Sequence, residues 1–191
     1  MNRLLLILIL TFSFQTLAKA DDIRDFEIEG MSIGDSLLNH YSKNILDNIN
    51  KYYYPNSKTI VGLYSGVFNK NLNNYDAIQF SVTPDNYQIE AIAGLNYEFK
   101  NKKNECYQKM EKIFNEIQSL FPNSETEKEK ESPHDADLSG KSVGKIYKIY
   151  LNNGIIRVAC TDWAKEINNF DSLKISIHSK KHIDWINKEA Y

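Results

Sequence analysis

The sequence lacks the features that mark a nucleic-acid-binding or membrane-spanning protein. Lys and Arg total 23 against 25 Asp and Glu, which gives a formal net charge of −2. Binding to a phosphate backbone needs clustered basic side chains, whereas the lysine doublets at 102–103 and 180–181 stand isolated. No apolar run after residue 20 is long enough to cross a bilayer. We therefore expect no nucleic-acid partner and no stable membrane insertion.

The start of the chain has the pattern of a secretory signal. Residues 1–20 place an arginine before an apolar run over 4–14 and end in Ala18-Lys19-Ala20, the small-x-small pattern of signal cleavage. The run is about half of the ~20 residues that span a bilayer, so an uncleaved anchor is the weaker alternative. No cysteine directly follows Ala20, so the segment lacks the acceptor for a lipid anchor. We expect a mature chain from Asp21, periplasmic or secreted.

Cleavage would leave one domain of moderate negative charge. The segment 1–20 contains two of the 23 basic residues and none of the 25 acidic ones, so the mature net charge is about −4. The residues from 21 to 191 are enough for a single domain with a core of useful size. We see no internal repeat in them.

Three segments have the apolar spacing of helices. Ser32 and Asp35 resemble a capping box, and apolar residues then recur at helical spacing, which predicts a helix from Ile33 to Ile49. A central helix is predicted from Lys103 to Phe121, ending before Pro122. The residues 180–190 predict a closing helix whose apolar side chains face inward. The apolar positions of these helices are Leu38, Tyr41, Ile45 and Ile49; Cys106, Met110, Ile113, Ile117 and Leu120; and Ile183 and Ile186.

Alternating apolar residues predict antiparallel hairpins. Residues 75–82 and 87–99 flank the turn sequence TPDN, and residues 145–151 and 155–161 flank Asn153-Gly154, a strong hairpin signal. Residues 59–68 and 173–177 predict two further strands. The resulting class is α+β: an antiparallel sheet built from hairpins, covered by the central helix, with N- and C-terminal helices.

The segment from Asn123 to Ser142 differs from its surroundings in composition. It is rich in charge, and Leu138 is its one apolar side chain larger than alanine. Such a segment buries too little surface to offset its ordering entropy. We predict a mobile charged loop inside the domain.

The two cysteines, Cys106 and Cys160, are predicted to form a disulfide. Each falls on the apolar face of its own element, one on the central helix and one on a strand. A helix that covers a sheet brings such faces together, and export delivers both thiols to an oxidising compartment. The alternatives are two inert buried thiols, or a reactive Cys160 beside His178 and Asp162.

Two motifs in the charged segment resemble ligand loops. Gly140-Lys141-Ser142 ends like a phosphate-binding loop, but Asp135 stands where that loop needs its first glycine. The run from Asp135 to Gly140 also matches the start of a calcium loop, but Ile146 stands where a bidentate carboxylate is needed. A turn and a solvated acidic loop are the favoured interpretations.

The histidines and hydroxyl residues do not form a site pattern. His178 and His182 are four residues apart, but a strand–helix boundary is predicted between them, so we interpret them as surface histidines. No third metal ligand stands at a fixed spacing, and nothing resembles a nucleophile elbow. We therefore expect no catalytic residue, no metal site and no cofactor.

Four segments resemble a family of short exported bacterial proteins. The resemblance covers nearly all of the mature chain and assigns no activity, so it implies no catalytic residue. The segments are DIRDFEIEGMSIGDSLL at 22–38, GLNYEFKNKKNECYQKM at 94–110, GKS at 140–142 with CTDW at 160–163, and LKISIHSKKHIDWI at 173–186.

Two functions fit these observations. The first is a non-catalytic envelope or secreted interaction module, with another envelope protein as its partner. The alternative is a periplasmic small-ligand-binding protein or a hydrolase, with a cleft between sheet and helix and tyrosines such as those at 52–54 as stacking surfaces. A broad apolar patch would favour the first, and a cleft with converging polar side chains would favour the second.

Overall fold

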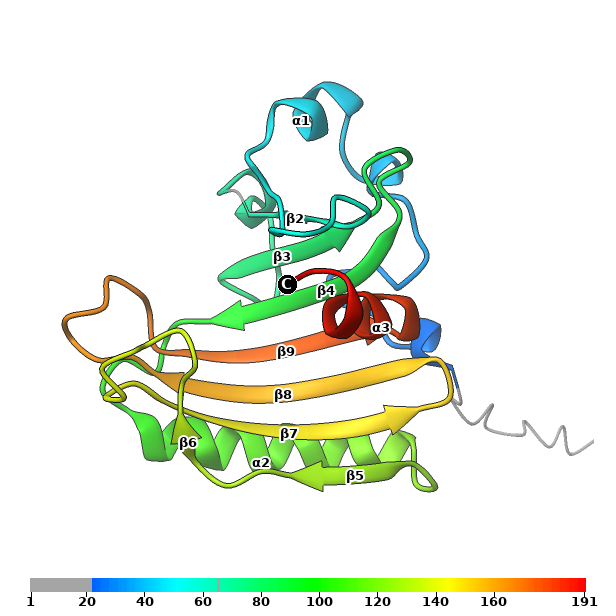
Figure 1. Cartoon of the computed structure of the whole chain (residues 1–191). Helices are drawn as coiled ribbons and strands as arrows, with labels where there is room; N and C mark the ends of the chain where they lie inside the picture. The colour runs from blue at the N-terminus through cyan, green and yellow to red at the C-terminus, as the bar shows by residue number, and fades with distance from the viewer. Residues whose placement is uncertain (1–21, 65) are drawn as a thin grey trace, which may run out of the picture.

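The computed structural model describes residues 22–64 and 66–191 (Figure 1). The predicted signal peptide, 1–20, and the predicted mature start at Asp21 lie outside these residues. The described chain combines helices with a nine-stranded sheet in which all the pairings are antiparallel, so the α+β class is confirmed. Within the described ranges, no helix is both long and apolar enough to cross a membrane.

The sheet joins two hairpins that are far apart in sequence. The strand order is β1-β2-β3-β4-β9-β8-β7-β5, and β6 pairs with β7. β3 pairs with β4, and β7 with β8, as the turn signals predict. The strands are β1 Lys51–Tyr52, β2 Val61–Leu63, β3 Ala77–Val82, β4 Ile89–Asn96, β5 Glu125–Lys128, β6 Ser132–Pro133, β7 Val143–Leu151, β8 Gly154–Asp162 and β9 Ser172–Ser179.

The predicted first helix, 33–49, is wrong. In its place are the 3-10 turn η2, Leu37–Asn39, and the short helix α1, Lys43–Asn48. Ser36 and Ser42 each accept a backbone N–H at the start of their own element, so each begins a new turn. Asp35 does accept from the Ser32 N–H at 2.9 Å, but this pair closes a turn rather than a helix.

The long helix α2, Lys103–Leu120, packs against β7, β8 and β9. In Figure 1 it is seen along the lower edge of β7. Cys106, Met110, Phe114 and Ile117 are buried on it and share one core cluster with inward-facing residues of β8. The buried face therefore includes Phe114, whereas Leu120 is 53% exposed. Cys106 and Cys160 lie at disulfide distance, with their Cα atoms 6.1 Å apart.

The charged segment 123–142 contains two short strands where we expected only a loop. β5 pairs with β7 as an outer strand. Lys128 makes an ion pair with Glu111, and Lys148 makes ion pairs with Glu127 and Glu129. Backbone pairing with β7 supplies the order that the side chains do not supply by burial. The mobility of the segment 123–142 stays a prediction.

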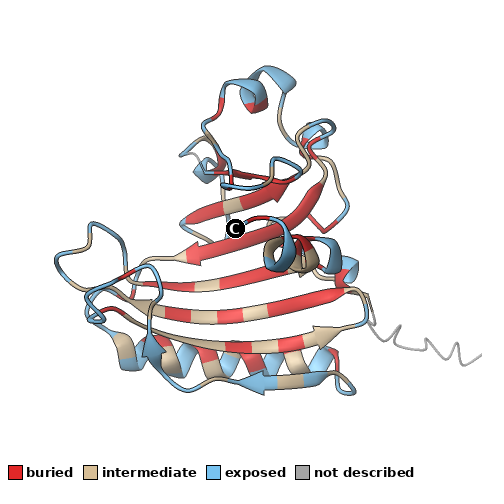
Figure 2. Cartoon of the chain, viewed as in Figure 1, coloured by how far each residue is buried: buried red, intermediate tan, exposed pale blue. Residues whose placement is uncertain are grey.

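The two faces of the central strands differ in chemistry. On β9, Leu173, Ile175 and Ile177 belong to the core cluster on the α2 side. Lys174, Ser176 and His178 alternate with them and point to the other face. Figure 2 shows half-buried residues interspersed among buried ones along β8 and β9. The helix α3, Lys180–Lys188, lies in front of this second face, which we call the open face (Figure 1).

Candidate ligand-binding pocket

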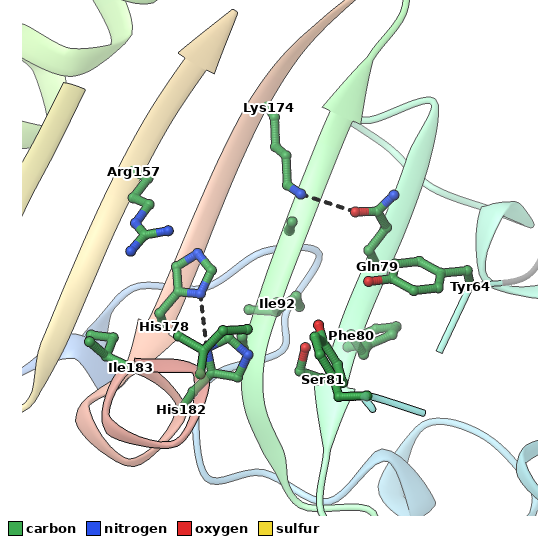
Figure 3. Close-up of a pocket in the computed structure, with 14 residues that line it drawn as sticks. Tyr64, Gln79, Phe80, Ser81, Ile92, Arg157, Lys174, His178, His182 and Ile183 are labelled. Carbon is green, nitrogen blue, oxygen red and sulfur yellow. Dashed lines mark hydrogen bonds between the residues drawn. The ribbon is translucent and has the colours of Figure 1, made fainter. Parts of the chain in front are cut away.

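A cavity of about 170 Å³ lies between α3, the segment that includes β1 and β2, and the open face of the sheet. Its floor is made by β3, β4, β8 and β9, and its walls by residues of α3 and by Tyr54 and Tyr64. Fourteen residues line it, and none of them is Asp or Glu (Figure 3). This is the place where a sheet and a helix form a cleft with converging polar side chains.

Small side chains on the floor leave room for large polar ones. Ala91 pairs with His178, and Ala93 pairs with Ser176, across the β4–β9 ladder. Arg157 on β8 stands opposite Ser176. Because the neighbouring alanines and serine are short, the long side chains of these strands extend into open space above the sheet.

A second, small core holds the walls in place. Tyr54, Ile60, Trp185 and Ala190 are buried together, apart from the main core. Trp185 Nε1 donates to Ser57 Oγ at 2.8 Å, which ties α3 to the loop that carries Tyr54. Helix α3 begins at Ser179, whose Oγ accepts from the His182 N–H at 3.0 Å. The helix and the tyrosine segment thus form one frame over the sheet.

Two basic side chains lie in the pocket with few protein acceptors. Lys174 Nζ donates to Gln79 Oε1 at 3.1 Å, which uses one of its three donors. The buried Nε of Arg157 has no hydrogen-bond partner among the described residues. Burial lowers the pKa of both groups, and the nearby Arg157 lowers the pKa of Lys174 further. A guanidinium nevertheless stays protonated, so the site keeps a desolvated positive charge.

The two histidines, predicted at the surface, are in contact with each other in this pocket. His178 Nδ1 and His182 Nδ1 are 3.2 Å apart, and His178 Nε2 is 2.9 Å from Ser176 Oγ. His182 is only 5% exposed. The surface interpretation failed because α3 starts directly after β9 and turns back over the strand, which brings the two rings into contact through their Nδ1 atoms (Figure 3).

The histidine pair leaves one buried nitrogen without a partner among the described residues. Burial is the main cause that lowers the pKa values of both histidines, and the charge of Arg157 is the next. The pKa of His178 lies well below its usual range, and that of His182 lies at about 4. Both rings are therefore neutral at pH 7. One Nδ1–H can donate to the other Nδ1, but His182 Nε2 then has no partner among the described residues, whichever ring donates.

These side chains are not arranged for a metal ion. In the ranges that the structure describes, no group of three or more His, Cys, Asp or Glu residues could hold one. Two imidazoles face each other, but Arg157 and Lys174 line the same cavity and would repel a cation. The charge of the pocket fits an anion instead.

The other motifs of the sequence do not contribute to this pocket. Asp137 accepts from Ser142 N at 2.8 Å, Ser142 Oγ at 2.7 Å and Ser139 N at 2.9 Å, and these bonds lower its pKa. Its carboxylate thus stabilises the turn around Gly140. Cys160 belongs to the core face of β8, while His178 lies on the open face, so the two do not converge.

The sequence contained a signal for this pocket that we interpreted differently. Lys174, Ser176 and His178 alternate with apolar residues on their strand, and we interpreted His178 as a surface histidine. Arg157 lies among Ile155, Ile156 and Val158, in an otherwise apolar strand. The closing helix required an apolar surface to pack on, and that requirement alone could have indicated a partly covered second face.

Comparisons with known proteins do not assign a family to this fold or this pocket. No family model, no curated protein and no solved structure matches the chain. The resemblance to short exported bacterial proteins therefore stays a prediction.

Proposed function

We propose that this chain is a small-ligand-binding protein whose open-face pocket takes a small organic anion. The observation that supports this most is the pair of buried, unpartnered nitrogens, Arg157 Nε and His182 Nε2, in a cavity without any acidic lining residue. A buried polar group without a partner costs roughly 1–3 kcal/mol, and more when it is charged. When His178 Nδ1–H donates to His182 Nδ1, His182 Nε2 carries the ring hydrogen, and an anion that accepts from it and from Arg157 Nε removes that cost.

Charge and geometry support the same assignment. Arg157 and Lys174 stand on the neighbouring strands β8 and β9, and charge-assisted hydrogen bonds to carboxylate or phosphate oxygens are about twice as strong as neutral ones. The bound anion would also raise the pKa of Lys174, which burial lowers. We place this function ahead of the interaction module, because the pocket offers converging polar groups. Export to the periplasm or medium is part of the proposal.

Calorimetric titration with small carboxylates and phosphate, each compared with a neutral analogue, tests the proposal. We expect at least one anion to bind and its neutral amide to bind at least tenfold more weakly. Arg157→Met and Lys174→Met should each weaken binding about tenfold or more. The matched control is Lys165→Met, a change at an exposed lysine outside the pocket. If no anion binds the folded wild type, or if the control loses as much affinity, the proposal is wrong.

A further inference from the structure

We infer that the pocket selects a one-ring organic acid, which places its carboxylate at Arg157 and Lys174 and its ring against Tyr64. This inference rests on the proposed function and makes it more specific. Arg157 and His178 lie on one side of the cavity and Tyr64 on the other, and the Lys174 amine lies between them, where it donates to Gln79 (Figure 3). A ligand that fills the cavity must therefore satisfy a cationic end and an aromatic end at once.

The aromatic end belongs to a connected group of rings. Tyr54 contacts Trp185 edge-on, with ring centroids 4.7 Å apart, and Tyr52 at 4.9 Å. Tyr52 in turn lies 6.4 Å from Tyr64. Tyr64 keeps 43% of its surface exposed. A half-exposed aromatic side chain held beside a cavity offers a stacking surface for another ring.

A glycine sets the position of Tyr64. A Cβ atom built on Gly62 would stand 2.8 Å from Cε2 of the Tyr64 ring, a distance that real Cβ contacts essentially never reach. Gly62 pairs with Ser81, which lines the pocket floor. The missing side chain at position 62 therefore lets the ring lie close to the sheet, at the edge of the cavity.

The aromatic end is uncharged over the physiological pH range. Burial raises the pKa of Tyr54 and of Tyr64, so both phenols stay protonated. A protonated phenol does not repel an anion and offers an apolar ring face. Ile183 and Ile186 of α3 add aliphatic surface to the same cavity. The pocket thus suits a ligand that is part anion and part apolar ring.

The volume limits the size of the ligand. A cavity of about 150 Å³ lined by apolar residues holds one benzene molecule, and this cavity measures about 170 Å³. Drug-sized ligands occupy roughly 300 Å³ or more. One six-membered ring with a carboxylate fits this volume, and a disaccharide or nucleotide does not. A free phosphate would fit but would leave the aromatic end without a contact.

Titrations with benzoate, acetate, phosphate and benzamide test the inference. We expect benzoate to bind at least tenfold more tightly than acetate or phosphate, because it alone buries a ring. Benzamide keeps the ring but lacks the charge, and should bind at least tenfold more weakly than benzoate. If acetate or phosphate binds as tightly as benzoate, the inference is wrong although the proposed function holds. If none of the three anions binds, both are wrong.

Two variants separate the ring contact from the anion contact. Tyr64→Ala should weaken benzoate binding on the order of three- to tenfold and leave acetate binding unchanged. Gly62→Ala changes no pocket side chain but displaces the Tyr64 ring, and should act in the same direction. The control is Tyr53→Ala, an equally exposed tyrosine that does not line the cavity. Equal losses for benzoate and acetate in Tyr64→Ala would overturn the inference.

Discussion

The two faces of the central strands bury their side chains for different purposes. On the α2 side, β8 and β9 present Ile156, Val158 and Ile175 to a cluster of apolar residues. On the open face, the intervening positions hold Arg157, Lys174 and His178. Among the described residues, Arg157 Nε has no hydrogen-bond partner, and Lys174 donates to Gln79 alone. The first face can stabilise the fold, while the second carries a desolvation cost that a ligand would offset. This comparison teaches that burial alone does not separate core from site.

The largest expected effect lies on the core face, at the predicted disulfide. Cys106 and Cys160 are 54 residues apart in sequence, and closing such a loop contributes at most about 4 kcal/mol in the chain-entropy model. Cys160→Ala should lower the free energy of unfolding by up to that amount, measured by urea denaturation, without lowering anion affinity. Alkylation of purified wild type under denaturing, non-reducing conditions should label no thiol. Two labelled thiols per chain would disprove the bridge.

The second-largest expected effect is a loss of folding stability at acid pH, and it originates in a histidine of the open face. The pKa of His182 is about 4 in the folded chain against about 6.5 when unfolded, so the unfolded state binds the proton first as pH falls. Stability is therefore highest above pH 6.5 and decreases toward pH 4, by on the order of 3 kcal/mol from this residue. His182→Gln should show a flatter curve in urea unfolding at pH 7, 5.5 and 4.

The control for this pH dependence is an exposed histidine. His40→Gln should follow the wild-type curve, because His40 is exposed on the surface. Parallel curves for His182→Gln and the wild type would contradict the burial of this imidazole as the source of the acid sensitivity.

A smaller effect of opposite sign is expected at the buried lysine. Lys174→Met removes a desolvated amine and keeps its aliphatic volume, so the unliganded protein should become more stable by about 1–2 kcal/mol. The same change should abolish most anion binding, which distinguishes a functional residue from a structural one. Thermal unfolding with and without benzoate measures both. Loss of stability in the unliganded variant would show that Lys174 belongs to the core instead.

The smallest effect is expected when one of the two ion-pair partners of Lys148 is removed. Lys148 stands opposite Arg157 across the β7–β8 ladder, but it makes ion pairs with Glu127 and Glu129. Glu127 is exposed, so Glu127→Gln should leave the urea midpoint of unfolding nearly unchanged. It should also leave anion affinity within twofold. A larger loss of affinity would mean that the binding site extends beyond the described cavity.

The predictable parts of the fold are those in which a local pattern and the tertiary structure agree. The hairpin at Asn153-Gly154 and the alternation in β4 follow from turn chemistry and period-two burial. The helix at 33–49 failed because apolar spacing does not account for the capping serines at 36 and 42. The strand β5 was missed because its pairing with β7 does not depend on side-chain burial.

The sequence could indicate a covered second face but not the set of residues in the pocket, because the residues of β3 and β4 meet those of β8 and β9 only through the β4–β9 pairing. Gln79 and Lys174 are 95 positions apart in sequence, and no local pattern joins them. The sequence does indicate that polar residues alternate along β9, but it does not indicate what lies above them. That depends on α3 turning back over its own strand, as the small core around Trp185 shows.

The pairing of β4 with β9 also makes the pocket sensitive to a specific local motion. This ladder joins the first hairpin to the second, and the cavity spans it, with Tyr64 on the side of the first and Arg157 on the side of the second. A molecule that contacts both side chains connects the two halves of the sheet. The amides between β4 and β9 should then exchange their hydrogens with solvent more slowly when the cavity is filled. Exchange at this seam thus reports occupancy without any label on the ligand.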